Sequence, residues 1–332
     1  MKLASFRAEG RERIGLGLAD GSLVDLLDAV DAVEGPAAAS AVPPEMMALI
    51  RAGDAALALL RRAAAETQSN SRVRRFSAEE VTWRPPVRTP SKIVCIALNN
   101  RALDKVKIRA PTDHPAFFLK PSTALTGHGQ PVRLRPAFGL THPEPELAVV
   151  IGTQIKNVAP ADVPAAVFGY TVMNDITCVG MREEDSFSVR YYRPDPETGK
   201  PVPDVGHTSY PGRYKASDTF APLGPWLVTR DEIPDPADLR IRCWLGERLV
   251  ASDHSRNYVW DVANAISQVT RTMTLLPGDV VSMGTAVGGD EDDPDQPDIP
   301  GVTRANLNGY QGAVTVTIDG LGTLTNPIET EA

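Results

Sequence analysis

The sequence predicts an α+β fold in which a strand-rich body follows a small leading module of mixed α and β structure. The body contains many short apolar runs, rich in β-branched residues and separated by Gly and Pro, which is typical of strands. Few segments show helical periodicity, and no GxGxxG motif follows a strand. We expect strands at Ile93–Leu98, Ala116–Leu119, Leu147–Ile151, Gly169–Met173, Trp226–Thr229, Leu239–Trp244, Val280–Met283 and Ala313–Ile318.

The predicted leading module covers residues 1–87, and the predicted catalytic domain covers residues 88–332. The segment TWRPPVRTPSK (82–92) carries three prolines. Such clustered prolines mark a turn or a linker, so we place the boundary near residue 88. Within the module we expect strands at Lys2–Phe6, Ile14–Leu18 and Ser22–Asp25, and a helix that includes Ala56–Ala65.

Two helices and two long polar segments are expected in the body. The helices lie at Pro160–Phe168 and at Trp260–Thr274, where Asp261 favours the first turn. Arg182–Ser217 is interpreted as a long polar loop, and loops of that length in compact domains are usually functional or disordered. A cover over an active site and a packing excursion are equal alternatives for it. Asp290–Asp298 holds six acids and no base, and is interpreted as a solvated or mobile loop.

Composition excludes several classes of protein. The chain has 332 residues, with 34 Lys and Arg against 42 Asp and Glu, and a formal net charge of −8. This balance disfavours a general nucleic-acid binder, which normally presents a basic face. The three cysteines have no CxxC spacing, so neither a disulfide framework nor a zinc knuckle is indicated. We see neither a signal peptide nor an apolar stretch of about 18–20 residues, and therefore expect no membrane contact and a cytoplasmic location.

Two glutamates precede a buried strand in HPEPELAVVIG (142–152). Glu144 and Glu146 are two residues apart, so in an extended chain their side chains share one face, with Cα atoms about 6.5–7 Å apart. Such carboxylates repel each other, and a divalent cation that prefers oxygen ligands would relieve the repulsion. Two exposed glutamates at the end of a loop are the alternative. Asp175, in GYTVMNDIT (169–177), is a candidate third ligand, although Asn-Asp also commonly forms a turn.

Six sequence blocks occur in a characteristic order: FFLKPSTALTG (117–127), HPEPELAVVIG (142–152), GYTVMNDIT (169–177), YKASDTFAPLGPWLVT (214–229), LLPGDVVSMGT (275–285) and IDGLGTLTNPI (318–328). Together they resemble the fumarylacetoacetate hydrolase family over roughly residues 90–330. The resemblance implies a mixed β-roll catalytic domain, a homodimer and a divalent metal held by Glu144, Glu146 and Asp175. Mg²⁺ is the expected cofactor, with Mn²⁺ or Ca²⁺ as alternatives.

The resemblance also implies a class of substrate and the residues that contact it. Family members act mainly on 2-oxo acids and 1,3-dicarbonyl compounds, including acylpyruvates, so a 2-oxo acid is the expected small-molecule partner. Lys215 and Lys120 match basic positions suited to an oxyanion, and Thr285 matches a position that contacts the substrate carboxylate or oxyanion. Without the motifs, two surface amines and a turn hydroxyl would be the default interpretation.

The match fails where hydrolytic members place a His and a Glu that activate water. In IALNNRALDKVK these positions hold Leu103 and Val106, a form that resembles the LNxR variant of the isomerase and decarboxylase branch. A second departure places Arg182 where hydrolases have a Gln that reaches the substrate. General-base help typically contributes about 10²–10⁴-fold to the rate, so these losses weaken the prediction of a hydrolase more than the prediction of a metal site.

C–C bond hydrolysis of a 2-oxo acid or β-diketo acid is the leading functional expectation, because it is the commonest activity that the resemblance implies. Isomerisation or tautomerisation, decarboxylation or dehydration of a 2-oxo acid is the main alternative, and a non-catalytic relative that binds a metal or a dicarboxylate is a further one. His207, in the long polar segment, is the first candidate for a base delivered by a lid. Tyr191 and Tyr192 in the same segment, together with Arg182, are candidate substrate contacts.

Overall fold

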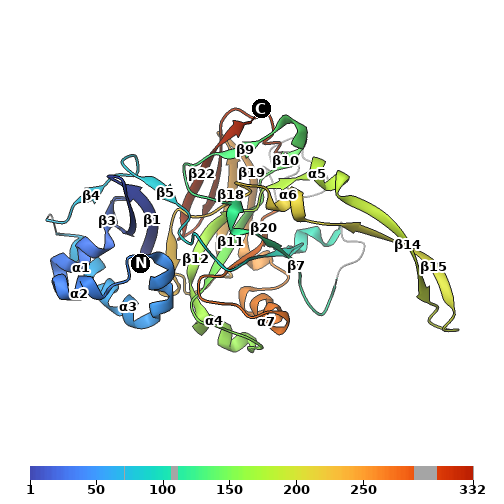
Figure 1. Ribbon diagram of the computed structural model, residues 1–332, viewed down its shortest axis with the longest axis horizontal. Helices are drawn as coiled ribbons and strands as arrows, with labels where there is room; N and C mark the ends of the chain where they lie inside the picture. The colour runs from blue at the N-terminus through green and yellow to red at the C-terminus, as the bar shows by residue number, and fades with distance from the viewer. Residues whose placement is uncertain (71, 106–110, 288–304, 332) are drawn as a thin grey trace.

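The computed structural model describes residues 1–70, 72–105, 111–287 and 305–331 (Figure 1). The predicted acidic loop Asp290–Asp298 and Val106 lie outside the described residues. The described chain is an α+β fold, as predicted, in which two large sheets carry most of the strands.

The larger sheet runs through both predicted domains. Its strands are β1 (Lys2–Ala8), β2 (Arg11–Gly17), β3 (Leu23–Asp25), β4 (Arg75–Phe76), β5 (Thr82–Arg84), β6 (Ile93–Ala97), β7 (Ala116–Lys120), β11 (Pro145–Ile151), β12 (Val167–Asn174), β17 (Leu227–Thr229) and β20 (Val280–Thr285). Their order is β4-β3-β2-β1-β17-β12-β11-β20-β6-β7, with β5 paired to β1. Antiparallel pairing of β1 with β17, with Lys2 opposite Val228, joins the leading module to the body.

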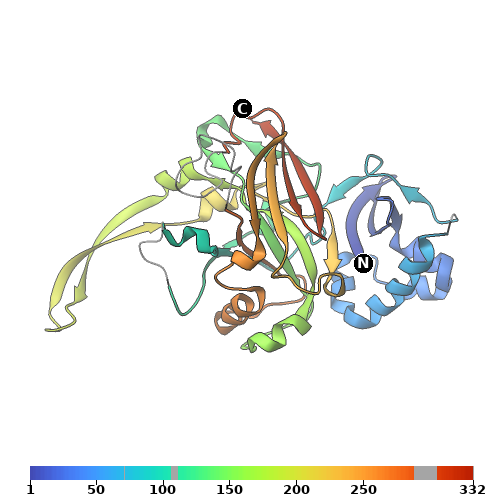
Figure 2. The ribbon, with the colours of Figure 1, turned by 180° about the vertical axis from the view of Figure 1, so that it is seen from behind.

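The second sheet packs against the body strands of the first (Figure 2). Its strands are β9 (Val132–Leu134), β18 (Arg240–Leu245), β19 (Arg248–His254), β21 (Ala313–Ile318) and β22 (Gly322–Thr330), in the order β19-β18-β21-β22-β9. Along β21 every second residue is buried, as its alternating sequence predicts. Apolar residues of both sheets form one core, which encloses the strands that carry the predicted metal ligands. Two short pairs complete the body: β8 (Leu125–Thr126) with β16 (Ala221–Pro222), and β10 (Thr141–His142) with β13 (Thr177–Cys178).

The α-helices are short outside the leading module. The leading module contains α1 (Leu26–Glu34), α2 (Pro36–Ala41) and α3 (Met46–Thr67). The described part of the body contains α4 (Val163–Ala166), α5 (Val179–Glu184), α6 (Gly212–Ala216) and α7 (Val262–Thr272). The 3-10 helices are η1 (Arg101–Lys105), η2 (Ser122–Ala124), η3 (Pro136–Phe138), η4 (Pro160–Asp162), η5 (Arg230–Glu232) and η6 (Ser255–Asn257). The predicted helix at Ala56–Ala65 lies within α3, which is kinked at Gly53, where φ is 62°. Helix α7 begins after Asp261, whose carboxylate accepts a hydrogen bond from the backbone N–H of Asn264.

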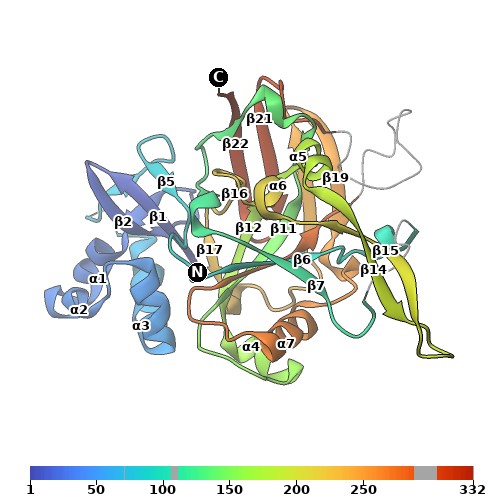
Figure 3. The ribbon, with the colours of Figure 1, turned by 45° about the vertical axis from the view of Figure 1, so that its right-hand side comes forward.

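The structure corrects two expectations. The helix predicted at Pro160–Phe168 is shorter, because Val167 and Phe168 already belong to the buried strand β12, where β-branched and aromatic side chains pack well. The segment Arg182–Ser217 is not a loop. Most of it is a β-hairpin made of β14 (Ser186–Pro194) and β15 (Pro201–Ser209), which projects from the body between α5 and α6 (Figure 3).

Candidate metal and substrate site

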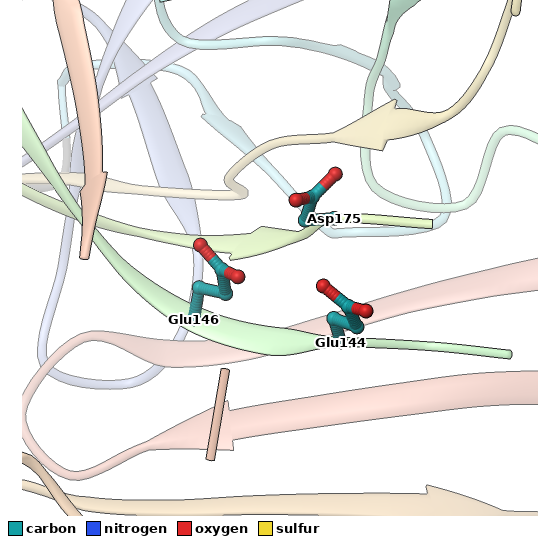
Figure 4. Close-up of side chains that lie close together, drawn as sticks. All are labelled: Glu144, Glu146 and Asp175. Atoms are coloured by element: carbon teal, nitrogen blue, oxygen red, sulfur yellow. The ribbon is translucent and has the colours of Figure 1, made fainter. Parts of the chain in front are cut away.

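Antiparallel pairing of β11 with β12 brings the three predicted metal ligands together (Figure 4). Glu146 lies opposite Met173, and beyond the paired strands the N–H of Asp175 donates to the carbonyl oxygen of Glu144 at 2.8 Å. The side-chain oxygen of Asn174 accepts from the N–H of Glu144 at 2.9 Å. One carboxylate oxygen from each of Glu144, Glu146 and Asp175 lies within 4.8 Å of the other two. The strand register therefore creates a carboxylate cluster, made of these three residues, from two separate parts of the sequence.

Two buried lysines face the carboxylate cluster from other elements. The Nζ atom of Lys120, at the end of β7, lies 2.6 Å from the Asp175 carboxylate and donates to the carbonyl oxygens of Phe220, at 2.8 Å, and Lys215. The Nζ atom of Lys215, on α6, donates to Glu144 at 2.6 Å and to Asp175 at 2.7 Å. Both lysines are buried, so neither is a surface amine.

The charges of this cluster shift its pKa values in opposite directions. Burial raises the pKa of Glu146 well above its usual value, and repulsion from Asp175 and Glu144 adds to that shift. Burial would also raise the pKa of Glu144, but the Lys215 ammonium and a hydrogen bond from His142 lower it. Burial opposes the charged form of Lys215, yet the three carboxylates raise its pKa. Lys215 is therefore a fixed positive charge at neutral pH.

The cluster fits a divalent cation because, with all three carboxylates ionised, its negative charge exceeds its positive charge. Three carboxylates face two ammonium groups. Among the described residues, no Lys or Arg forms an ion pair with Glu146; its Oε2 atom accepts from the Ser282 hydroxyl and from the N–H of Gly284 at 3.1 Å. A buried carboxylate is costly without a counter-charge, and carboxylate oxygens are the ligands that hard divalent cations prefer. We conclude that Glu144, Glu146 and Asp175 form a candidate divalent-metal site.

Three further predicted positions lie on three different elements. Thr285 pairs with Glu146 across β20 and β11, and its hydroxyl donates to the carbonyl oxygen of Ala286 at 3.0 Å. Leu103, which the resemblance aligns with the hydrolytic His, is half-buried on η1. Arg182 is exposed on α5. Of these three, Thr285 has the direct connection to the carboxylate cluster through the sheet.

The remaining predicted residues lie on the projecting hairpin. His207 is on β15, with its Nδ1 atom 2.8 Å from the hydroxyl oxygen of Ser188. The Tyr191 hydroxyl donates to Asp204 at 3.3 Å, and Tyr192 is 71% exposed. In the described part of the chain, no hydrogen bond or ion pair joins His207, Tyr191 or Tyr192 to the carboxylate cluster. Their proposed roles as base and substrate contacts stay predictions.

Sequence analysis missed two polar residues that orient the glutamates. Asn174 holds the backbone of Glu144, and Ser282 holds the carboxylate of Glu146. Both are buried in mostly apolar strands, and buried polar groups normally form hydrogen bonds. A polar residue in a predicted buried strand was therefore the sequence signal that could have indicated these two roles. His142, at the end of β10, lies against the cluster as well, with its Nε2 atom 3.3 Å from a Glu144 carboxylate oxygen.

A comparison with known protein families decides the membership of the chain. The family described as "Fumarylacetoacetate (FAA) hydrolase C-terminal" matches residues 92–329. The chain belongs to the fumarylacetoacetate hydrolase family. It is therefore an enzyme of that family, either a hydrolase or a lyase or isomerase. The resemblance seen in the sequence and the predicted fold class are thus confirmed.

Individual relatives of the family span most of the chain. "Protein Rv2993c" of Mycobacterium tuberculosis is 32% identical over 72% of this chain and 75% of its own length. "Oxaloacetate tautomerase Fahd2a, mitochondrial" of Rattus norvegicus is 30% identical over 87% of this chain and 82% of its own length. Among solved structures, a maleylpyruvate hydrolase from Sphingobium sp. SYK-6 in complex with manganese(II) and pyruvate is 26% identical over the full length of both chains, with a TM-score of 0.70.

These findings bear on cofactor and location at a coarse level. The manganese(II) complex of the solved relative supports a divalent metal at the carboxylate cluster. It does not single out magnesium, which stays a prediction. Among the helices in the described ranges, none combines the length and apolar character needed to cross a membrane. The rat relative is named as mitochondrial, so the cytoplasmic location stays a prediction, as does the homodimer.

Proposed function

We propose that this chain is a divalent-metal-dependent tautomerase of a 2-oxo acid, which interconverts its keto and enol forms. The observation that carries the proposal is the combination of the carboxylate cluster and two buried lysines with Leu103 on η1. A cation held by the carboxylates, together with the two ammonium groups, can stabilise negative charge on a substrate oxygen. The aliphatic side chain of Leu103 cannot activate water. The relative named an oxaloacetate tautomerase supports this class of reaction.

The three carboxylates would hold the cation, and the sheet fixes their positions. A bound divalent cation polarises a carbonyl group and stabilises negative charge that develops on its oxygen. Ser282 and the N–H of Gly284 orient the Glu146 carboxylate, while Asn174 orients the backbone of Glu144. These contacts exist before substrate binds, and preorganised charges lose little energy to reorganisation during a reaction.

The lysines would act as fixed charges and not as bases. The pKa of Lys215 is raised by the surrounding carboxylates, so the ammonium form persists across the neutral range. An ammonium beside a carbonyl oxygen favours the enolate form of the substrate. Thr285, at the edge of β20 beside Glu146, is the proposed contact for the substrate carboxylate.

Keto–enol exchange of oxaloacetate tests the proposal. Metal-loaded protein should speed the loss of enol absorbance from freshly dissolved oxaloacetate at least tenfold over the same metal concentration alone, a factor that corresponds to about 1.4 kcal/mol of barrier. Mg²⁺ and Mn²⁺ are compared in parallel. Glu146→Gln should abolish the acceleration, and Glu329→Gln, on an exposed glutamate, should leave it unchanged. Equal rates with and without protein would contradict the proposal.

C–C hydrolysis is the second candidate, because the solved maleylpyruvate hydrolase shares the fold over the full length of both chains. An acylpyruvate is incubated with the metal-loaded protein, and products are followed by NMR. Release of pyruvate and a free acid supports hydrolysis, whereas unchanged acylpyruvate together with oxaloacetate tautomerisation supports the first candidate.

His207→Gln and His142→Gln are then compared in whichever of the two assays shows turnover. A loss of kcat in one of them identifies the histidine that transfers the proton.

A further inference from the structure

A second buried carboxylate, Asp253, lies near the end of β19 outside the carboxylate cluster. Within the described part of the chain, four neutral N–H groups donate to it. Its Oδ1 atom accepts from the side chain of Asn257 at 2.6 Å and from the N–H of His254 at 2.7 Å. Its Oδ2 atom accepts from the side chain of Asn100 at 2.8 Å and from the N–H of Val287 at 3.0 Å. One oxygen therefore binds the local chain, and the other joins two distant segments.

The first distant segment leads into η1. The amide oxygen of Asn100 accepts from the N–H of Ala102 at 2.9 Å, so the Asn100 side chain links Asp253 to the first turn of that helix. This turn carries Leu103. Next to it, the side chain of Asn99 donates to the carbonyl oxygen of Met283 at 2.7 Å. The start of η1 is thus fixed at two adjacent residues.

The second distant segment runs beside Glu146. The N–H of Gly284 donates to the Glu146 carboxylate, and the N–H of Ala286 donates to the carbonyl oxygen of Pro145 at 2.9 Å. Val287 follows directly, and its N–H donates to Asp253. Asp253 therefore holds the far end of the segment that contains Thr285.

We propose that Asp253 is a positioning residue for substrate binding: it fixes η1 and Thr285–Val287 relative to each other at the edge of the carboxylate cluster. This inference rests on the proposed function for its link to a substrate. The Glu146 carboxylate is held by Ser282 and Gly284, which precede the segment that Asp253 anchors. Loss of the Asp253 contact therefore affects substrate binding more than metal binding.

Two alanine variants that remove different donors from the same carboxylate test the inference. Asn100→Ala removes the link to η1, and Asn257→Ala removes a hydrogen bond to the local chain only. Loss of a hydrogen bond to a charged group has an effect of roughly tenfold or more. Asn100→Ala should raise KM for oxaloacetate about tenfold, with kcat and metal Kd within about twofold, and Asn257→Ala should leave KM unchanged. Equal shifts of KM in both variants would overturn the inference.

Asp253→Asn and hydrogen exchange complete the test. Asp253→Asn should raise KM at least as much as Asn100→Ala, and the double variant should show no further rise, since coupled residues are not additive. Hydrogen exchange of the Ala102 and Val287 amides should be faster in Asn100→Ala and in Asp253→Asn than in Asn257→Ala. This measurement needs no turnover. If the native chain lacks tautomerase activity, faster exchange still supports the positioning role, whereas unchanged exchange contradicts it.

Discussion

The carboxylate cluster and the β14–β15 hairpin are neighbours along the chain, but they are supported in opposite ways. The chain leaves the cluster at Asp175, passes through α5 into the hairpin, and returns through α6 to Lys215. In the cluster, Glu146 and Asp175 are buried, Glu144 is partly buried, and the three side chains are held by residues from other elements. The hairpin projects from the body, and its two strands pair along their length with each other (Figures 1 and 3).

This difference predicts how large the effect of a substitution should be in each region. In the cluster, removal of one charge leaves another buried charge without its partner, and such losses are large. On the hairpin, Phe187 is 47% exposed and Tyr192 is 71% exposed, so little apolar surface is buried there. A two-stranded hairpin is marginally stable by itself. We therefore expect large effects in the cluster and small effects on the hairpin.

Lys120→Met should produce the largest effect on stability. The Nζ atom of Lys120 contacts the Asp175 carboxylate and the carbonyl oxygens of Phe220 and Lys215. Methionine fills a similar volume but offers no charge and no donor. Breaking a buried ion pair from one side typically costs about 3–5 kcal/mol, and we expect the free energy of unfolding to fall by that amount in urea titrations of metal-free protein.

Lys156→Met is the matched control for that variant. Lys156 is exposed, and its Nζ atom donates to the carbonyl oxygen of Arg271 at 3.0 Å. Surface substitutions usually change stability by less than about 0.5 kcal/mol. Similar losses in Lys120→Met and Lys156→Met would contradict the view that the cluster depends on buried charge.

Glu146→Gln should separate metal binding from stability. Replacement of one ligand carboxylate should weaken the affinity for Mg²⁺ or Mn²⁺ by more than about 100-fold, because loss of partners outside the ligand set already costs about 10–100-fold. Without metal, burial and two nearby carboxylates raise the pKa of Glu146 and so oppose its charged form, and glutamine has a similar shape without that charge. The Tm of the variant in chelator should therefore be equal to that of the native chain or higher. Calorimetry with metal and thermal unfolding in chelator test the two parts, and unchanged metal affinity would dismiss the site.

The two regions also differ in how well the sequence predicts them. The central parts of the two strands next to the ligands were predicted, because Leu147–Ile151 is a continuous apolar run and Gly169–Met173 is mostly apolar. The start of β12 was not, because Val167 and Phe168 had been assigned to a helix. The ligand residues followed from the spacing of Glu144 and Glu146 together with the family blocks. The orienting roles of Asn174 and Ser282 did not follow, since they depend on which strands become neighbours.

The hairpin was not predicted from the sequence, for a different physical reason. Phe187, Val189 and Tyr191 alternate with Ser188 and Arg190 along β14, but Arg193 stands at the next position expected to be apolar. Its charge is balanced across the hairpin by Asp204, at 2.8 Å. A single sequence does not show such cross-strand pairs. The pairing of β1 with β17 was not predicted either, because it joins Lys2 and Leu3 to Val228 and Leu227, which lie far away in the sequence. Long-range pairing determines both features, and local propensity does not encode it.

Shortening the hairpin should have the smallest effect on stability and also tests the lid hypothesis. Replacement of residues 190–205 by Asn-Gly joins Val189 to Gly206, which are paired residues, through a two-residue turn that suits a hairpin. The removed residues form the outer part of the projection, so the free energy of unfolding should change by less than about 1 kcal/mol. Urea titration measures this change, and a larger loss would show that the hairpin supports the body.

The same shortened chain decides whether Tyr191 and Tyr192 contact substrate. It keeps the pairing of Ser188 with His207 and both flanking helices, so Asp175 and Lys215 retain their connections. The lid hypothesis predicts a higher KM for the 2-oxo acid with an unchanged metal Kd, because only the cover would be lost. A KM within about twofold of the native value, a difference below about 0.5 kcal/mol, would rule the lid out and confine substrate recognition to the buried cluster.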